Sequence, residues 1–244
     1  MEEKQAKEKR TTLKELEQRK AYLQDESRPE AVQKRHQKGK RTARENVADL
    51  CDPDCFVEFG SLIVAAQTAR RSMQDLIERT PADGLIAGVG TVNAPSFGEE
   101  QSRCVIMSYD YTVLAGTQGG FNHKKTDRMI RLAKEAQLPV IFFVEGGGGR
   151  PGDVDFVPVT VGGLDISTFV EYARLQGQVP RIAIASGYCF AGNAALAGCS
   201  DVIIATEDIS IGMGGPAMIE GGGAWSISSK RNWPCKCSNT KWSH

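Results

Sequence analysis

The spacing of hydrophobic residues divides the chain near residue 83. Residues 3–25 are nearly all strong helix formers with interleaved charges and a thin apolar stripe, so they predict an exposed helix. A second short helix is expected over residues 29–38. Residues 40–60, KRTARENVADLCDPDCFVEFG, predict a helix that ends at Asp52-Pro53 and a strand after it.

After residue 83, apolar runs with strand spacing alternate with amphipathic runs. The runs that start at Pro139, Arg181 and Asp201 are apolar, which predicts strands buried on both faces. Asp165 or Ser167 is available as the N-cap of a following helix. The alternation predicts an α/β domain with helix-covered sheets. The expected strands span 84–93, 103–116, 139–144, 181–187 and 201–208, and the expected helices span 123–138, 165–178 and 191–200.

The charges balance, with 30 Lys+Arg against 30 Asp+Glu, so global charge does not favour nucleic acid or an anionic membrane as a partner. No apolar run approaches the roughly 20 residues that a membrane span needs. The start, MEEKQAKEKR, has neither the apolar core of a secretory signal nor the acid-poor character of a transit peptide. We therefore expect a soluble, cytoplasmic protein, with the mitochondrial matrix as the alternative compartment.

The seven cysteines, an odd number, mostly sit in apolar stretches, as Cys104 and Cys189 do. Buried free thiols in a reducing compartment are therefore favoured over disulfides. Cys51 and Cys55 flank an Asp-Pro turn and resemble half of a zinc site, but the globular part of the sequence has no second pair at zinc-finger spacing. We expect no metal site.

Two junctions between a strand and a glycine-rich turn are candidates for chemistry. One is residues 142–150, FFVEGGGGR, and the other is residues 184–193, IASGYCFAGN. Glycines leave backbone N–H groups uncovered, and the second run also opens a helix, whose first N–H groups lack intrahelical partners. Two such N–H groups that converge on one point can hold an oxyanion. The alternative is that these glycines serve only tight turns and close packing.

Other common active-site motifs do not occur in the sequence. Neither strand is followed by GxxxxGK[ST], which argues against a nucleotide P-loop, and there is no Gly-x-Ser-x-Gly elbow. His36 and His123 are the histidines that precede residue 224, so a Ser–His–Asp hydrolase is not supported.

The segment 186–208, SGYCFAGNAALAGCSDVIIATED, resembles the glycine-rich segment of the crotonase superfamily, whose members bind acyl-CoA thioesters. Further motifs are similar to the amino-terminal half of the carboxyltransferase component (beta-type subunit) of biotin-dependent acyl-CoA carboxylases. The resemblance covers about residues 28–223, in order. The motifs are KRHQKGKRTARENVADLCDPDCFVEFG, ADGLIAGVGTVN, YDYTVLAGTQGGFNHKKTDRMIRLAKEAQLPVIFF and GGGGRPGD.

This resemblance implies a crotonase-like (ClpP/crotonase) α/β domain of repeated β-β-α units, preceded by a helical arm. It also implies transfer of carboxylate from carboxybiotin to the α-carbon of an acyl-CoA through an enolate. Biotin would be carried by a partner, the biotin carboxylase or biotin carrier subunit or domain, and full-length members form homo-oligomers. Matching motif to motif places the oxyanion donors at the backbone N–H groups of Gly149, with Gly148 beside it, and Gly192, with Ala191 beside it.

Two positions depart from related patterns. Ala195 stands where enoyl-CoA hydratases keep a glutamate, which argues against hydration because that reaction needs a carboxylate for acid–base catalysis on water. Glu145 stands where relatives often have serine just before the glycines. It is either the base of a crotonase-type isomerase or hydrolase, or a carboxylate that caps the turn.

Basic residues near the glycines are candidates for CoA contacts. Lys124, Lys125 and Arg128 lie at the start of a helix, and Arg150 directly follows the glycine run. Ammonium and guanidinium groups in these positions would suit the phosphates of CoA. The alternative for the helix residues is a solvated basic face. The sequence does not distinguish among acetyl-, propionyl- and longer acyl-CoA.

Residues 224–244, AWSISSKRNWPCKCSNTKWSH, have no strand or helix period, whereas related carboxyltransferases continue into a second half. The codons allowed for this tail permit LGVFHPREIGPASVQIPNGVI one nucleotide later, and each tryptophan codon then forces a glycine that the family continuation also has. We therefore interpret 224–244 as a frameshifted or mis-spliced, disordered tail, after a charged helical arm over 1–45 and a carboxyltransferase domain over 46–223. We expect such a truncated chain to be inactive alone; the alternative is a non-catalytic fragment that binds CoA or subunits.

Overall fold

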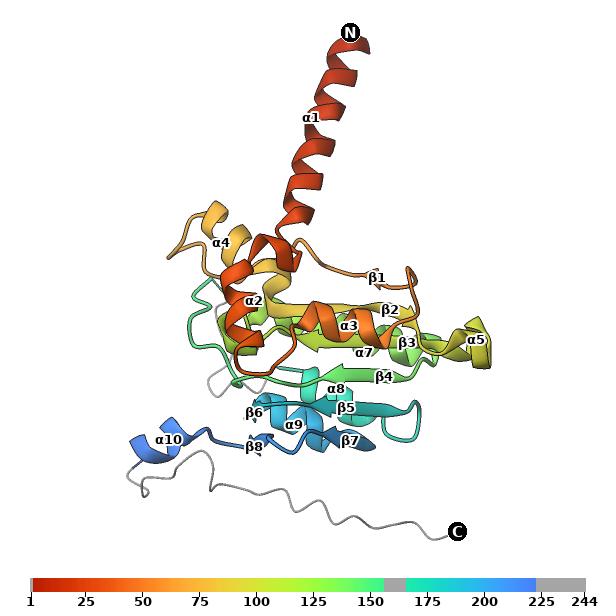
Figure 1. The fold of residues 1–244 in the computed structure, drawn as a ribbon, viewed down its shortest axis with the longest axis vertical. Helices are drawn as coiled ribbons and strands as arrows, with labels where there is room; N and C mark the ends of the chain where they lie inside the picture. The colour runs from red at the N-terminus through yellow and green to blue at the C-terminus, as the bar shows by residue number, and fades with distance from the viewer. Residues whose placement is uncertain (1, 156–165, 223–244) are drawn as a thin grey trace.

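A six-stranded mixed sheet forms the centre of the computed structural model, which describes residues 2–155 and 166–222 (Figure 1). The strand order is β1-β2-β3-β4-β5-β7; β2 is antiparallel to both of its neighbours, and the remaining pairs are parallel. Leu85 pairs with Tyr109 across β2 and β3, and Val105 pairs with Val140 across β3 and β4. The strands are β1 (Val57–Glu58), β2 (Leu85–Thr91), β3 (Arg103–Tyr109), β4 (Val140–Phe143), β5 (Arg181–Ala185) and β7 (Val202–Ala205).

Helices cover both faces of this sheet (Figure 1). One face packs against α7 (Gly120–Ala136), α8 (Thr168–Arg174) and α9 (Gly192–Gly198), and the other against α3 (Ala43–Leu50). Met107 and Phe142 belong to the first hydrophobic core, whereas their chain neighbours Ile106 and Ile141 belong to the second. Burial on both faces is the reason that these strands are apolar along their length.

The helices expected in the first 60 residues are present, and their boundaries follow local rules. Helix α3 begins with a capping box, in which the Thr42 hydroxyl accepts the Glu45 N–H and the Glu45 carboxylate accepts the Thr42 N–H. It ends at Leu50, shortly before Asp52-Pro53. The other helices are α1 (Glu2–Ala21), α2 (Pro29–His36), α4 (Met73–Arg79), α5 (Ala94–Phe97), α6 (Glu99–Ser102) and α10 (Pro216–Gly221), with 3-10 turns at Asp25–Ser27, Pro81–Gly84 and Leu114–Gly116.

The ends of two predicted helices differ in the structure. Helix α7 begins at Gly120, three residues before the predicted start, because the carboxylate of Asp153 accepts the N–H of Gly120 (3.1 Å). Ser167 precedes α8 but does not cap it, since its hydroxyl donates to Asp127 instead (2.7 Å). The other candidate cap, Asp165, lies outside the described residues.

The expectation that the strand within 201–208 is buried is wrong. Strand β7 is an edge strand, and Val202, Ile203 and Ile204 are 52%, 47% and 54% exposed. A small second sheet, in which β6 (Tyr188–Phe190) runs parallel to β8 (Ser210–Gly212), was not predicted. Its strands are too short to produce a recognisable alternation of polar and apolar residues.

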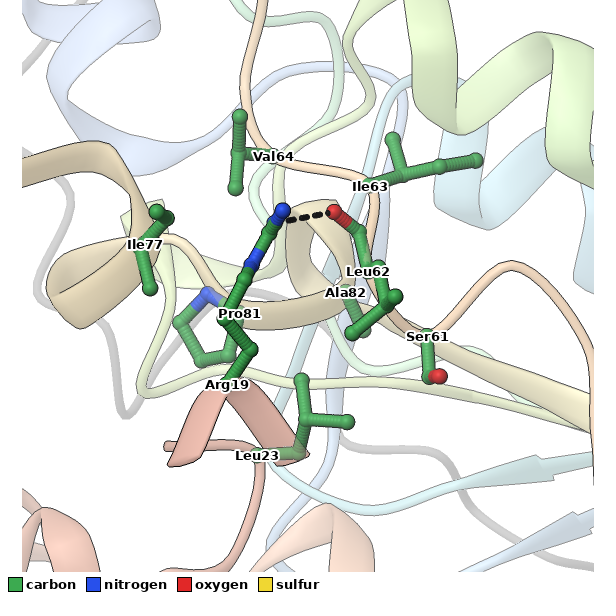
Figure 2. A pocket seen from close by; sticks show the side chains of 9 residues that line it. All are labelled: Arg19, Leu23, Ser61, Leu62, Ile63, Val64, Ile77, Pro81 and Ala82. Atoms are coloured by element: carbon green, nitrogen blue, oxygen red, sulfur yellow. Dashed lines mark hydrogen bonds between the residues drawn. The ribbon is translucent and has the colours of Figure 1, made fainter. Parts of the chain in front are cut away.

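Helix α1 projects from the rest of the protein and is anchored at its end (Figure 1). Figure 2 shows Arg19 reaching from α1 to the Leu62 carbonyl oxygen, to which its guanidinium donates at 2.8 Å. Ile77 and Leu23 are among the residues that line a cavity of about 10 Å³ beside this contact. The base of the arm is therefore packed against the loop that follows β1.

Among the described helices, none is both long and apolar enough to cross a membrane. The same part of the chain contains no cluster of side chains suited to a metal ion, and its five cysteines are free thiols. The interpretation of 224–244 as an aberrant tail concerns residues outside those that the structure describes.

Candidate active site

The two glycine-rich junctions lie side by side in the structure. The first follows β4 and the second connects β5, β6 and α9. The N–H of Gly146 donates to the Tyr188 carbonyl (2.7 Å), and the carbonyl of Gly146 accepts the N–H of Phe190 (2.9 Å). These two bonds form a parallel β-bridge between Gly146 and Cys189. The sheet therefore brings together two segments that are about 40 residues apart in the sequence.

Most backbone N–H groups of these junctions already have acceptors. Gly147 donates to the Ala115 carbonyl (2.9 Å), and Ala191 donates to the Gly212 carbonyl (2.9 Å). The N–H of Gly148 donates to the side-chain oxygen of the buried Asn193 (3.0 Å). Gly148 and Ala191 are therefore structural members of the site and not free donors.

The N–H groups of Gly149 and Gly192 are different. Neither has an acceptor among residues 2–155 and 166–222. Gly149 is exposed, and Gly192 is the first residue of α9, where an N–H has no intrahelical partner. Of the four candidate donors, these two are available to a ligand.

Close backbone packing fixes the two junctions against each other. Gly148 has a φ of +90°, and a Cβ atom added to it would lie 2.7 Å from the Cβ of Ala191. Ala191 itself has a φ of 50° and a ψ of −117°, an unfavourable conformation for a residue with a side chain. Strain of this kind persists only where surrounding contacts determine the conformation, as the bond to Gly212 does here.

Gln118 connects the two available donors. The backbone N–H of Gln118 donates to the Gly148 carbonyl (2.7 Å), and its backbone carbonyl accepts the N–H of Arg150 (2.8 Å). Gln118 therefore bonds to the residues on both sides of Gly149. Its side-chain nitrogen donates to the hydroxyl of Tyr109 (2.8 Å). The side-chain oxygen lies where a Cβ atom on Gly192 would be. A side chain at residue 192 would therefore displace the buried Gln118.

The side chain of Arg150 is buried beneath the first glycine junction and does not face solvent. Its side chain is 3% exposed and pairs with the carboxylate of Asp83, while also donating to the Thr117 carbonyl (2.7 Å). Burial raises the pKa of Asp83 above its ordinary value, and the charge of Arg150 opposes part of that rise. The interpretation of Arg150 as a phosphate contact is corrected, because its guanidinium is enclosed by protein groups.

The basic start of α7 divides into a buried and an exposed part. Lys125 is buried, and its ammonium donates to the carbonyl oxygens of Leu85 and Ala82, so it does not face a ligand. Burial lowers the pKa of Lys125 to about 8. Lys124 and Arg128 are exposed. The assignment of Lys125 to CoA phosphates is therefore corrected, whereas that of Lys124 and Arg128 stays a prediction.

A cavity of about 630 Å³ opens beside the first donor. Gly149, Gln118 and the start of α7 line it, together with His123 and Ser167. No atom would lie within 4 Å of a Cβ on Gly149, so the space on the side-chain side of this residue is open. The cavity has room for a planar group against the donor.

Hydrogen bonds fix the tautomer of His123 in this cavity. The hydroxyl of Thr168 donates its single proton to the carboxylate of Asp127, which can only accept. The 2.9 Å contact between Nδ1 of His123 and the Thr168 oxygen therefore requires the proton to be on Nδ1. Burial lowers the pKa of His123 below its ordinary value, although Asp127 opposes this. The imidazole is thus neutral near pH 7, with Nε2 as an acceptor.

Glu145 has a role that neither sequence-based interpretation anticipated. Both of its carboxylate oxygens accept from the guanidinium of Arg35 on α2, at 2.9 and 2.7 Å, and both residues are buried. Burial raises the pKa of Glu145, and Arg35 opposes the rise. Within the described chain no backbone N–H donates to this carboxylate, so it does not cap the turn. Its bidentate pairing also leaves it poorly placed to act as a base.

Sequence reasoning overlooked Asn193, Gln118 and Asp153 as supports of the site. Asn193 lies on the second junction, and Asp153 follows the first, so both were within the quoted motifs. Polar residues at such places commonly bond to uncovered backbone groups. Lys125 lies four residues before the buried Met129, a spacing that places it on the buried face of α7.

Comparisons with known proteins identify the family of the chain. Residues 34–230 match the family model described as carboxyl transferase domain. The chain is 30% identical over 195 residues to the methylmalonyl-CoA carboxyltransferase 12S subunit of Propionibacterium freudenreichii subsp. shermanii, covering 78% of this chain and 33% of that protein. It is 29% identical over 198 residues to the propionyl-CoA carboxylase beta chain of Cereibacter sphaeroides, covering 81% of this chain and 36% of that protein.

Solved structures give the same result. A single-chain, multi-domain long-chain acyl-CoA carboxylase superimposes with a TM-score of 0.85 and 57% identity, over 92% of this chain and 22% of that one. The transcarboxylase 12S hexamer, with methylmalonyl-CoA bound, superimposes with a TM-score of 0.70 and 27% identity, over 90% of this chain and 39% of that one. The fold is thus crotonase-like, as predicted. The chain spans about a third of the length of the curated relatives it matches.

Proposed function

Because the chain belongs to the carboxyl transferase domain family of biotin-dependent acyl-CoA carboxylases, we propose that it provides the acyl-CoA site of such an enzyme. The reaction would join a carboxylate to the α-carbon of an acyl-CoA. Carboxybiotin, carried by a partner carrier subunit or domain, would supply that carboxylate. The open cavity at Gly149 leaves space for a second reactant beside the thioester.

The residues of this chain would act mainly on the thioester oxygen. Loss of the α-proton moves negative charge onto that oxygen, and the N–H groups of Gly149 and Gly192 would donate to it. Donors fixed in advance stabilise such charge strongly, by about 10²–10³ in rate for one donor. Gln118 and Arg150 would hold Gly149 in place through their backbone and side-chain bonds.

The matched relatives are about three times as long as this chain. The subunits and partners of the complete enzyme are therefore part of the proposal. The transcarboxylase 12S relative forms a hexamer. We infer a homo-oligomer for the enzyme to which this chain belongs, with biotin carboxylase and carrier units as partners. Lys124 and Arg128, at the exposed start of α7, are proposed as additional CoA contacts.

The two backbone N–H groups that have no acceptor among the described residues carry this proposal, and an enolate mimic tests it. The probe is a CoA derivative whose acyl group is replaced by a nitronate, a planar anion. We expect the chain to bind it at least about 100-fold more tightly than propionyl-CoA, as is common for transition-state analogues. Gly192→Val should abolish this preference, because the added side chain overlaps Gln118 and blocks the donor.

Gly198→Val is the matched control, since it lies in the same helix and a Cβ there meets no atom within 4 Å. It should keep the preference for the nitronate. Equal affinities of the parent chain for the nitronate and for propionyl-CoA would remove the oxyanion role from both glycines.

A further inference from the structure

A neutral imidazole lines the cavity that opens beside Gly149. His123 and Gly149 are both wall residues of this cavity. Nδ1 of His123 donates to the Thr168 oxygen (2.9 Å), so Nε2 is the acceptor of the ring. No group among the described residues donates to Nε2. The ring therefore offers an available lone pair within the candidate active site.

The other titratable side chains that line the cavity are not available as bases. Each carboxylate oxygen of Asp127 accepts from a hydroxyl at the start of α8. The two oxygens of Asp153 accept a side-chain amide N–H and the backbone N–H of Gly120, both at 3.1 Å. Lys124 carries an ammonium group, which can only donate. Along the described part of the wall, His123 is thus the residue that can take up a proton.

The imidazole also lies close to the second oxyanion donor, with the ring of Phe169 in contact with both. The rings of His123 and Phe169 meet edge to face, with their centroids 5.7 Å apart and an angle of 72° between their planes. The tip of the same phenyl ring lies 3.0 Å from the place of a Cβ atom on Gly192. The acceptor and the two donors therefore border one small region of the site.

The charges around His123 suit a ring that is neutral at rest and positive after it takes up a proton. Burial lowers the pKa of His123 most, the charge of Asp127 raises it, and the charge of Arg150 lowers it. Lys124 and Asp153, also on the cavity wall, contribute one charge of each sign. Asp127 is linked to the ring through a hydroxyl group, so its charge would stabilise the imidazolium. These are the properties of a general base.

An enolate forms only if a group takes the α-proton of the thioester, and the proposed function leaves that group open. We propose that His123 is this base, with Nε2 as the proton acceptor; the inference rests on the proposed function. The bond between the α-carbon and its hydrogen breaks, and an N–H bond forms at Nε2. The electron pair of the broken bond moves into the enolate, whose oxygen accepts from Gly149 and Gly192. Once the enolate has received the carboxyl group, His123 gives its proton to the biotin nitrogen that released that group, and the ring is neutral again.

Exchange of the α-protons of nitroethane with deuterated water, followed by proton NMR, tests the proposal. Nitroethane is a carbon acid without a CoA moiety, it is small enough for the cavity, and its nitronate resembles an enolate. The parent chain should accelerate the exchange above the rate in buffer. His123→Gln should lower the contribution of the chain by about 100-fold or more, the size of a general-base effect. His36→Gln, which removes the exposed histidine of α2, is the matched control and should behave like the parent.

Two further variants distinguish a base from a histidine that only supports the fold. His123→Ala should regain exchange when free imidazole is added, because the shortened side chain leaves space for it. Thr168→Val keeps the histidine but removes the acceptor at Nδ1, so it should also slow the exchange. Circular dichroism spectra that match the parent show that each variant folds.

The outcomes for this inference and for the proposed function are distinguishable. His123→Gln should keep the preference for the nitronate derivative of CoA, because that ligand is already ionised and needs no base. A parent chain that exchanges nitroethane but does not prefer the nitronate derivative retains the base and contradicts the proposed oxyanion site. Absence of exchange above the buffer rate in the parent chain overturns the inference, and so does equal exchange in the parent and His123→Gln.

Discussion

At the scale of single residues, the chemistry of the site depends on hydrogen bonds to neighbouring side chains. Asn193 occupies the N–H of Gly148, so the adjacent Gly149 is the residue left to meet a ligand. Thr168 and Asp127 determine which nitrogen of His123 carries a proton. Asn193 thus leaves Gly149 as the available donor, and Thr168 and Asp127 leave Nε2 of His123 as the available acceptor in the same cavity.

The first prediction concerns the tautomer of His123. At pH 7 the ring should be neutral and protonated on Nδ1, because the Thr168 oxygen can only accept from it. Nitrogen-15 NMR of the imidazole distinguishes the two tautomers directly. Thr168→Val removes the acceptor and should shift the ring toward the commoner Nε2–H form. An Nε2–H ring in the parent protein would contradict the assignment.

The second prediction concerns Lys125. Burial lowers the pKa of Lys125 to about 8 in the folded protein, whereas the pKa is about 10.5 in the unfolded chain. Between these values the unfolded state binds more protons, so the free energy of unfolding should rise with pH. Relative to Lys125→Met, the parent should gain up to about 3 kcal/mol across this window. Urea unfolding at several pH values measures the difference.

Lys124→Met, at the exposed neighbouring position, is the control for the pH experiment. It should leave the pH dependence of the parent intact. If Lys125→Met and the parent show the same slope between pH 8 and 10.5, the lysine is solvated and not buried.

At the scale of elements, a buried ion pair joins α2 to the segment that follows β4. Arg35 and Glu145 come from segments 110 residues apart, and each is about nine-tenths buried. Their bidentate contact fixes the short helix α2 next to the strand that ends in the glycine run. A buried charge that loses its partner is costly, much more so than an exposed one.

The third prediction follows from this pair. Arg35→Met should lower the free energy of unfolding by about 3–5 kcal/mol, because Glu145 would be left buried and unpaired. The double variant Arg35→Met/Glu145→Met should recover part of that loss. Arg41→Met, which breaks the exposed pair with Asp49, should cost less than about 1 kcal/mol. Similar losses in both single variants would show that the buried pair is not special.

The same scale shows which features were predictable from the sequence. The apolar strands and amphipathic helices were predictable, since the spacing of their hydrophobic residues is a local property of the chain. The exposure of β7 could not be predicted, because whether a strand is covered depends on other segments and not on its own residues. The pair of Arg35 with Glu145 was equally inaccessible, since nothing in either segment specifies a partner so far away in sequence. In contrast, the buried face of α7 could have been deduced from the spacing of Lys125 and Met129.

At the scale of the whole molecule, the described chain presents an apolar sheet edge, the strand β7. All three aliphatic residues of β7 are about half exposed, and its outer backbone groups are unpaired within the described sheet. Exposed edges of this kind favour association with other strands. Met213, after β8, and Met218, in α10, are also exposed.

The fourth prediction is that the 244-residue chain self-associates through this edge. Sedimentation velocity should show larger species as the concentration rises. Ile203→Lys should shift the distribution toward monomer, since a charged residue at an edge opposes pairing. Val170→Lys, at an exposed position on α8, is the matched control and should not change it. A parent chain that stays monomeric at high concentration would contradict the prediction.

The bond between Ala191 and Gly212 also has a consequence for the order of events during synthesis. The first glycine run leaves the ribosome well before Asn193, which must accept the Gly148 N–H, and before Gly212, which must hold Ala191. Chains elongate at about 5–20 residues per second, and earlier segments begin to fold first. Until residues 188–193 have followed, the N–H groups of Gly146 and Gly148 therefore lack their acceptors, the Tyr188 carbonyl and the Asn193 side chain. A chaperone that protects emerging strands would have its greatest effect in this interval.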